Sequence, residues 1–315
     1  GDSRFQLHEF GGVGKARALN LALAQTKASV IVVVDADSVV DPDFVERILP
    51  HFANSKVGAV AGNVKVGNRG RLLAKLQSLE YIVSLALDRR AQSHLGVVSV
   101  VPGAAGAFRR DALVRIGGWP ARTLVEDTDL TVSLLGAGWE IPYEPRAISW
   151  TEAPETAADV LKQRRRWAFG STEVAALNAR RILDRRHGRL GMVGLPWLVL
   201  AQVVLPAAGP VVDLFIIWLL LNADWGAALG MLALSLGGEI LVATWALKTE
   251  GESLRQLWLV PMARFIWRPL MLLSVVGSLR TWLIGGSVTW RKITRRNTVA
   301  HNYQLNLDND NLTPT

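Results

Sequence analysis

Polar and apolar positions divide the chain into two parts of different character. Up to residue 190, charged and apolar residues alternate as they do in soluble domains, and after it the chain consists mostly of Leu, Val, Ala, Ile, Gly and Trp. Stretches 192–221 and 226–247 each supply the roughly 20 mainly apolar residues that a spanning helix needs. Stretch 257–286 has the length but carries three arginines. The predicted regions are a soluble domain over 1–190, a membrane domain of about three apolar blocks over 191–290, and a polar tail over 291–315.

Within the first part, runs of β-branched residues alternate with stretches of helical spacing. Residues 30–34 are a continuous Val/Ile run, which is typical of a strand buried on both faces in a parallel sheet. Asp41 and Pro42 predict a helix, as its N-cap and first helical residue. The alternation predicts an α/β layered domain. Further strands are expected at 57–66, 97–101, 105–109 and 141–150, and helices at 15–27, 72–95, 111–116 and 127–135.

Composition and charge narrow the function further. The absence of cysteine excludes a disulfide scaffold and any Cys-ligated metal site. Lys and Arg number 35 against 27 Asp and Glu, for a net charge of +8. Segment 162–189 concentrates this charge, with nine Lys or Arg against Glu173 and Asp184. Because an apolar block follows at once and aromatic residues are few, the segment predicts a cytoplasmic juxtamembrane region and no nucleic-acid partner.

The C-terminal cluster of Arg291, Lys292, Arg295 and Arg296 also favours the cytoplasmic side, which conflicts with three crossings. Two explanations stay open. Either the first block, interrupted by Pro206, Gly209 and Pro210, forms a hairpin or two elements, or the arginine-bearing third block lies partly in the interface. Polar residues within the blocks are either functional or satisfied interhelical partners. They are Gln202, Asp213, Glu239, Arg264 and Arg268.

Asp35 and Asp37 follow the predicted strand at its carboxyl end, where open α/β sheets collect ligands. Two carboxylates on a tight turn can hold Mg²⁺ or Mn²⁺, which take carboxylate oxygens and share the rest of their shell with phosphates. A strand-end turn and helix cap explain the same residues equally well. The metal interpretation therefore depends on what else the chain contains.

Glu126 and Asp127 stand at the start of a predicted helix, where acidic residues are favourable partners of the helix dipole. Upstream lies a glycine-rich stretch that includes Gly103 and Gly106. Small residues let a bulky ligand approach the backbone, and a carboxylate beside such a floor can act as a general base.

Gln163, Arg166 and Trp167 form a Q-x-x-R-W sequence. Arg binds phosphate through its planar fork, Trp offers a flat face to a sugar, and Gln both donates and accepts hydrogen bonds. A basic amphipathic helix with Trp167 as interface anchor is the alternative. Earlier in the chain, Lys15 ends a glycine loop that matches neither a Walker A loop nor a dinucleotide fingerprint, so a simple turn before a helix explains it too.

Taken in order, the Gly-Lys loop, D-x-D, glycine floor, E-D pair, Q-x-x-R-W and apolar blocks resemble the membrane-embedded family 2 glycosyltransferases. That group includes the cellulose, chitin, hyaluronan and poly-N-acetylglucosamine synthases. Stretches 101–110 and 150–156 are most similar to the poly-β-1,6-N-acetylglucosamine synthase branch. The resemblance implies a cytoplasmic GT-A (Rossmann-like) domain followed by α-helical transmembrane segments in the plasma membrane.

The resemblance also implies residue roles. Asp127 matches the catalytic base, with Glu126 beside it, and Val125 stands where the family often has Thr. Asp35 and Asp37 match the residues that hold Mg²⁺ or Mn²⁺ on the donor. The donor-binding matches are Lys15, Asp35, Asp37, Gln163 and Arg166, and the acceptor-binding matches are Trp167, Gly103 and Gly106.

The implied reaction is inverting transfer of a sugar, by resemblance N-acetylglucosamine, from a UDP-sugar to a growing β-linked polysaccharide that is fed across the membrane. Accessory export or deacetylase subunits are implied as further partners. The family's uracil-binding strand should precede Gly1, and the first methionine is Met192, so we expect the N-terminal nucleotide-binding part to be missing. A non-processive transferase acting on a lipid and an inactive membrane scaffold are the alternatives.

Overall fold

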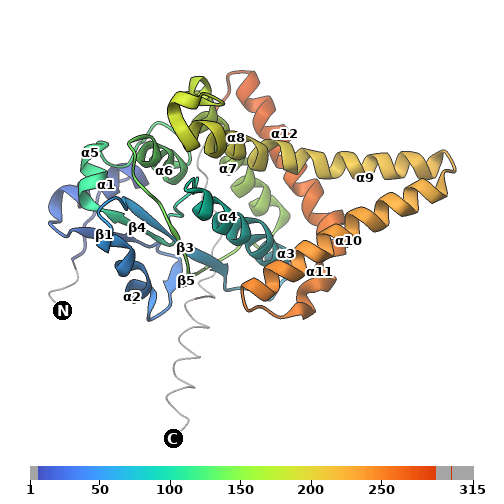
Figure 1. The fold of residues 1–315 in the computed structure, drawn as a ribbon, viewed down its shortest axis with the longest axis horizontal. Coiled ribbons are helices and arrows are strands. Elements are labelled where there is room, and N and C mark those ends of the chain that lie inside the picture. The colour runs from blue at the N-terminus through green and yellow to red at the C-terminus, as the bar shows by residue number, and fades with distance from the viewer. Residues whose placement is uncertain (1–5, 289–298, 300–315) are drawn as a thin grey trace, which may run out of the picture.

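The first part of the chain is a mixed α/β domain built on one five-stranded sheet (Figure 1). The computed structural model describes residues 6–288 and residue 299. The strand order is β1-β4-β3-β5-β2, in which β4 is antiparallel to β1 and β3, and β5 is parallel to β3. Strands β1, β3 and β5 therefore run in the same direction, and their carboxyl ends lie at the same end of the sheet. The strands are β1 Val30–Val33, β2 Ser38–Val40, β3 Ala59–Val66, β4 Gly106–Arg109 and β5 Tyr143–Thr151.

The Val/Ile run at 30–34 forms a strand, but not the kind predicted. β1 lies at an edge of the sheet, and among its residues only Val33 is buried. The prediction that it is buried on both faces in a parallel sheet is wrong, because its one partner strand is the antiparallel β4. The description fits β3 instead, whose eight residues are all buried.

The short link between β1 and β2 requires the sheet to curl. In a flat sheet the two edge strands would lie four spacings apart, or about 19 Å. Five peptide links from Val33 to Ser38 reach at most about 18 Å, and the hydrogen bond from Ser38 N to Asp35 O (2.9 Å) shortens them further. The segment that carries Asp35 and Asp37 therefore passes over the ends of β4, β3 and β5, which lie between β1 and β2 in the sheet.

Two hydrophobic clusters fill the two faces of the sheet. One includes Leu23 of α1, Leu113 of α5 and Leu130 of α6, and the other Phe44 of α2 and Ala74 of α3. Most predicted helices are confirmed within a few residues. The helices are α1 Lys15–Gln25, α2 Phe44–Ile48, α3 Leu72–Glu80, α4 Leu87–Leu95, α5 Arg110–Arg115, α6 Glu126–Gly136 and α7 Ala157–Leu177, with a 3-10 turn η1 Leu49–Ala53 and a π-helical turn η2 Tyr81–Ala86.

Two local predictions are wrong for reasons visible in the hydrogen bonds. The helix expected at Pro42 begins at Phe44, and Asp41 instead accepts a bond from Trp150 Nε1 (2.8 Å). Residues 97–101 form no strand, because side chains take up their amides: Val101 N donates to Thr131 Oγ1 (2.9 Å) and Ser99 N to Gln92 Oε1 (2.8 Å).

Three helical stretches of the second part are long and apolar enough to cross a membrane: Leu190–Leu221, Trp225–Thr249 and Leu254–Leu283. The first is continuous, so the hairpin alternative is wrong; Pro206 lies just after the π-helical turn η6, and Pro210 lies inside α9. Figure 1 shows α9 and α10 extending together away from the sheet. The elements are η5 Leu190–Gly194, α8 Leu195–Val199, η6 Leu200–Val204, α9 Leu205–Leu221, α10 Trp225–Thr249, η7 Leu254–Trp258, α11 Leu259–Met262, η8 Ala263–Trp267 and α12 Arg268–Leu283.

The last apolar helix, α12, packs along α7 of the α/β domain. Ser278 Oγ donates to Arg165 O (3.0 Å), and a Cβ at Gly277 would lie 2.5 Å from Arg165 Nη2. Glycine at this position therefore allows the guanidinium to lie against α12. The basic cluster at Arg291–Arg296 lies outside the described residues, so its predicted side of the membrane stays a prediction.

The loop between α10 and η7 is held against the α/β domain by ion pairs. Glu250 pairs with Arg90 (2.6 Å), and Glu252 pairs with Arg69 (2.8 Å) and Lys65 (3.2 Å). Burial opposes the charge on Glu252, but Arg69 and Lys65 outweigh it and lower its pKa to about 2. This end of the α10 helix is thereby fixed beside β3 and α4.

Candidate active site

The sheet register brings the D-x-D turn and the glycine-rich stretch together. Val33 of β1 pairs with Gly106 of the antiparallel β4, so residues after β1 meet residues before β4 at one edge. A Cβ at Gly103 would lie 3.7 Å from Asp35 Oδ1 and 2.5 Å from Lys15 Nζ. Gly103 thus gives the Lys15 ammonium the room that any larger residue would fill.

Lys15 joins three parts of the chain that are far apart in sequence. Its Nζ lies 2.5 Å from Asp35 Oδ1 and 3.4 Å from Glu126 Oε1. Burial alone would lower the pKa of Lys15, but the charges of Asp35 and Glu126 raise it above its ordinary value. The side chains of Lys15 and Asp35 stay 41% and 37% exposed, so this group of charges is open to solvent.

The acidic pair lies at the start of α6, as the sequence predicts. Burial, and next the charge of Asp127, raises the pKa of Glu126, while Lys15 and Arg166 oppose this. Asp127 Oδ1 accepts the amide of Thr128 (2.8 Å). Among residues 6–288 and 299, its second carboxylate oxygen accepts no hydrogen bond. We call Lys15, Asp35, Glu126 and Asp127 the site cluster.

The Q-x-x-R-W residues divide between two faces of α7. Arg166 faces the site cluster, where its charge acts on Glu126 and its Nη1 donates to Leu124 O (3.2 Å). Gln163 is buried on the other side and accepts from Gln77 Nε2 of α3 (3.1 Å). Trp167 is half-buried between two hydrophobic clusters, with the guanidinium of Arg164 4.6 Å from its ring centre.

Two further predicted site residues have local structural partners. Gly106 is buried in β4, where a Cβ would lie 2.9 Å from both Val101 and Phe108, so close packing alone explains this glycine. Asp37 Oδ1 lies 3.5 Å from Ser38 Oγ, within the turn that leads into β2. The predicted acceptor-binding role of Gly106 and the predicted metal-binding role of Asp37 stay predictions.

The donor set at the turn suits a cation shared with a ligand. Among residues 6–288 and 299, no group of three or more His, Cys, Asp or Glu is placed to hold a metal ion. Mg²⁺ is commonly bound by one or two carboxylates together with substrate phosphates, which is what Asp35 and Asp37 can supply. The residues therefore fit a metal that arrives with, or is completed by, a diphosphate.

Sequence comparison places the chain in a family. Residues 30–290 match glycosyl transferase family group 2. The chain belongs to this family. It is 37% identical over 162 residues to a poly-beta-1,6-N-acetyl-D-glucosamine synthase of Staphylococcus epidermidis and 36% identical over 162 residues to the one of Staphylococcus aureus strain COL. These alignments cover 51% of this chain and 39% of each relative, so the chain spans about two fifths of the length of the curated relatives that it matches.

Among solved structures, the family 2 chain is similar to a mannosyltransferase from Pyrobaculum calidifontis in complex with GDP-Man and Mn²⁺. The match has a TM-score of 0.45 and 20% sequence identity, and covers 81% of this chain and 67% of that one.

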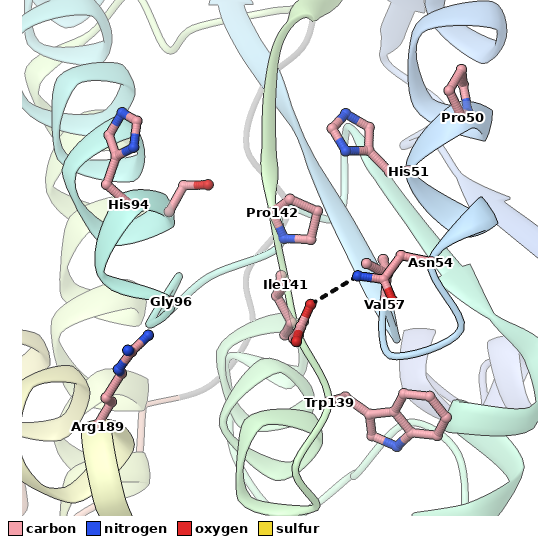
Figure 2. Close-up of a pocket in the computed structure, with 12 residues that line it drawn as sticks. Pro50, His51, Asn54, Val57, His94, Gly96, Trp139, Ile141, Pro142 and Arg189 are labelled. Atoms are coloured by element: carbon pink, nitrogen blue, oxygen red, sulfur yellow. Dashed lines mark hydrogen bonds between the residues drawn. The ribbon is translucent and has the colours of Figure 1, made fainter.

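A separate hollow of about 540 Å³ lies at the opposite ends of the strands (Figure 2). His94 and Arg189 stand on one side and His51 and Asn54 on the other, where Asn54 Nδ2 donates to Glu140 Oε2 (3.1 Å). No residue of the site cluster lines this hollow. The candidate site of this family 2 chain is therefore the exposed end of the sheet that carries the site cluster, and not this hollow.

The sequence analysis missed the residues that hold the loop before the acidic pair. Arg122 donates two bonds of 2.8 Å to Asp129, which is fully buried. Thr131 Oγ1 donates to Asp127 O (2.6 Å) and accepts from Val101 N, which ties α6 to the glycine-rich stretch. Asp129 is visible in the sequence as a third acid in the first turn of α6, but nothing in the sequence gives its partner.

Proposed function

We propose that this chain is the catalytic and membrane part of an inverting glycosyltransferase that extends a β-linked polysaccharide from a UDP-sugar donor. The supporting observation is the site cluster, in which Lys15, Asp35 and Glu126 converge from α1, the β1–β2 turn and α6. Membership in glycosyl transferase family group 2 and the likeness to the staphylococcal synthases support N-acetylglucosamine as the transferred sugar.

The proposed reaction is a single displacement. The Asp127 carboxylate takes the proton of an acceptor hydroxyl, and that oxygen forms a bond to the anomeric carbon as the bond from this carbon to the UDP oxygen breaks. Inversion follows from attack on the face opposite UDP. The cationic groups of Lys15 and Arg166 stabilise the negative charge that develops on the departing diphosphate.

Asp35 and Asp37 are the residues proposed to hold Mg²⁺ or Mn²⁺, which as a Lewis acid would neutralise charge on the diphosphate. Gln163, Trp167, Gly103 and Gly106 keep their proposed donor and acceptor roles.

The proposed location is a bilayer, with the α/β domain on the cytoplasmic side. Three candidate spans and the exposed arginines of 180–189 support this placement. Large apolar side chains on α9 and α10, such as Leu221 (82% exposed) and Leu234 (80% exposed), suit contact with lipid. Export or deacetylase subunits are proposed as further partners.

To test this, membranes that carry the full-length protein are incubated with a panel of radiolabelled UDP-sugars, in the presence of Mn²⁺ or of a chelator. We expect a metal-dependent, β-linked polymer from UDP-N-acetylglucosamine. Gel filtration measures the length of this polymer. A single sugar on extractable lipid would instead show a non-processive transferase. No transfer from any donor would favour the inactive scaffold and overturn the proposal.

A further inference from the structure

Helix α7 carries one face that contacts the loop directly before the acidic pair. Arg166, Gly170 and Glu173 are spaced four and three residues apart, so their side chains lie on the same face. Arg166 and Glu173 contact Leu124, and Gly170 lies against Val125, the two residues that precede Glu126.

Both backbone groups of Leu124 are held from this face. Glu173 Oε2 accepts the amide of Leu124 (3.0 Å), and Arg166 Nη1 donates to its carbonyl (3.2 Å). Neither group is part of a helix or strand, since α6 begins only at Glu126. Among residues 6–288 and 299, the amide and carbonyl of Leu124 have no other hydrogen-bond partner, so these two side chains of α7 orient the two peptide units that flank Leu124.

Gly170 brings the two elements into direct contact. A Cβ there would lie 2.8 Å from both Cγ atoms of Val125 and 3.1 Å from its amide nitrogen. Val125 is itself buried. The absence of a side chain at Gly170 therefore lets α7 pack directly against the loop. The two hydrogen bonds to Leu124 fix the orientation of the loop in this contact.

From this geometry we propose that Glu173 is a positioning residue for the acidic pair, acting through the amide of Leu124. The inference rests on the proposed function, because Asp127 is the base only in that reaction. Asp127 lies three residues after Leu124, at the first turn of α6, so rotation of the Leu124 peptide moves the start of the helix. Misplacement of a catalytic group by about 1 Å can cost about a hundredfold in rate.

The test compares Glu173→Ala with Glu173→Gln, which keeps an acceptor oxygen at nearly the same place. In membranes with UDP-N-acetylglucosamine, we expect Glu173→Ala to lower kcat at least about tenfold with donor KM within about twofold. Glu173→Gln should recover most of kcat. The matched control is Glu140→Ala, which also removes a hydrogen-bonded glutamate but at the far ends of the strands.

A second readout does not depend on transfer. Amide hydrogen exchange of the peptide containing Leu124 should accelerate in Glu173→Ala and stay near wild type in Glu173→Gln and Glu140→Ala. If Glu173→Ala keeps wild-type kcat, or if Glu173→Gln is as impaired as Glu173→Ala, the positioning role is overturned. If the wild type transfers no sugar, the proposed function fails, and unchanged exchange in Glu173→Ala would overturn the loop contact separately.

Discussion

Two groups of charged residues in this molecule differ in their charge balance, since one has an excess of acid and the other is balanced. The site cluster sets three carboxylates, Asp35, Glu126 and Asp127, around the ammonium of Lys15. The second group, which we call the membrane quartet, sets two arginines against two acids among the apolar helices. Its contacts are Arg264 with Glu239 (3.0 Å) and with Asp213, and Arg268 with Glu239 (2.5 Å) and Asp213 (3.2 Å).

The site cluster has more acidic than basic groups, whereas the charges of the membrane quartet are already paired with one another. In the membrane quartet each charge has two opposite partners, and the side chain of Arg264 is 3% exposed. Such pairs offset the cost of charge in an apolar region and need no ligand. The site cluster has an excess of acid and remains open to solvent, with the side chains of Lys15 and Asp35 41% and 37% exposed. Of the two explanations left open for Asp213, Glu239, Arg264 and Arg268, the structure favours interhelical pairing.

The sharpest test of the site cluster is Asp127→Asn. Loss of a general base typically costs a factor of about 10² to 10⁴, so we expect polymer formation to fall by at least about a hundredfold. UDP binding, measured by isothermal titration, should change little because Lys15 and Asp35 are untouched. Asp111→Asn, an exposed acid on α5, is the control. Polymerisation near the wild-type rate in Asp127→Asn would show that the base is another residue.

The stability of the protein should depend on the charge balance of the membrane quartet more than on any one of its residues. Arg268→Gln leaves two acids facing only Arg264. Removing one partner of a fully buried pair typically costs about 3–5 kcal/mol, and because the Arg268 side chain is 26% exposed we expect a loss at the lower end, about 3 kcal/mol. Asp213→Asn combined with Arg268→Gln leaves the Arg264–Glu239 pair intact and should recover part of that loss. The measurement is thermal unfolding in detergent or nanodiscs.

Arg280→Gln on the same helix is the control for the quartet, because Arg280 is exposed, and it should change stability by no more than about 0.5 kcal/mol. If the double variant were less stable than Arg268→Gln by the full cost of a second lost charge, the balanced description of the quartet would be wrong.

Sequence patterns predicted the two-part organisation and most elements because each depends on local spacing. The glycine pair after α5 has φ values of +85° and +84°, and the helix ends there as predicted. The edge position of β1 could not be predicted, because it depends on which strand pairs with β4. The strand β2 was missed as well, since its three residues follow the D-x-D turn without a hydrophobic pattern of their own.

The motif order identified residues that meet at the site cluster, but not how they meet. That Lys15 contacts both Asp35 and Glu126 depends on the register between β1 and β4 and on the curl of the sheet. The burial of Gln163 against Gln77 depends on how α7 packs on α3, which no short motif encodes. The loop contacts of Glu173 and Arg122 are likewise long-range or depend on loop geometry.

A smaller effect is expected for Lys15→Met. Lys15 lowers the pKa of Glu126, which burial and Asp127 raise, so its removal should raise that pKa further. Glu126 then stays protonated to higher pH, and the acidic limb of the kcat profile should shift upward. Donor KM should rise about tenfold, as expected for the loss of one charge-assisted contact of about 1.4 kcal/mol. Lys27→Met, just beyond α1 and exposed, is the control, and an unshifted acidic limb would contradict the role of Lys15.

The smallest effect concerns the junction between the two regions, where Glu252 pairs with Arg69 and Lys65. Its folded-state pKa of about 2 lies below its ordinary 4.5, so its contribution to stability is complete above about pH 4.5 and is lost as pH falls toward 2. A shift of this size corresponds to about 3 kcal/mol at most, and solvent screening at this partly exposed loop reduces it to about 1 kcal/mol. Glu252→Gln should therefore lower the free energy of unfolding at pH 7 by about 1 kcal/mol and flatten the decline of this free energy below pH 4.5, as measured by urea unfolding in micelles.

The control is Glu46→Gln, on the exposed face of α2, which should change neither the free energy of unfolding at pH 7 nor its decline at low pH. Because the quartet lies within the apolar helices and the Glu252 contacts lie at their end, equal losses from both would remove the distinction between these two places in the molecule.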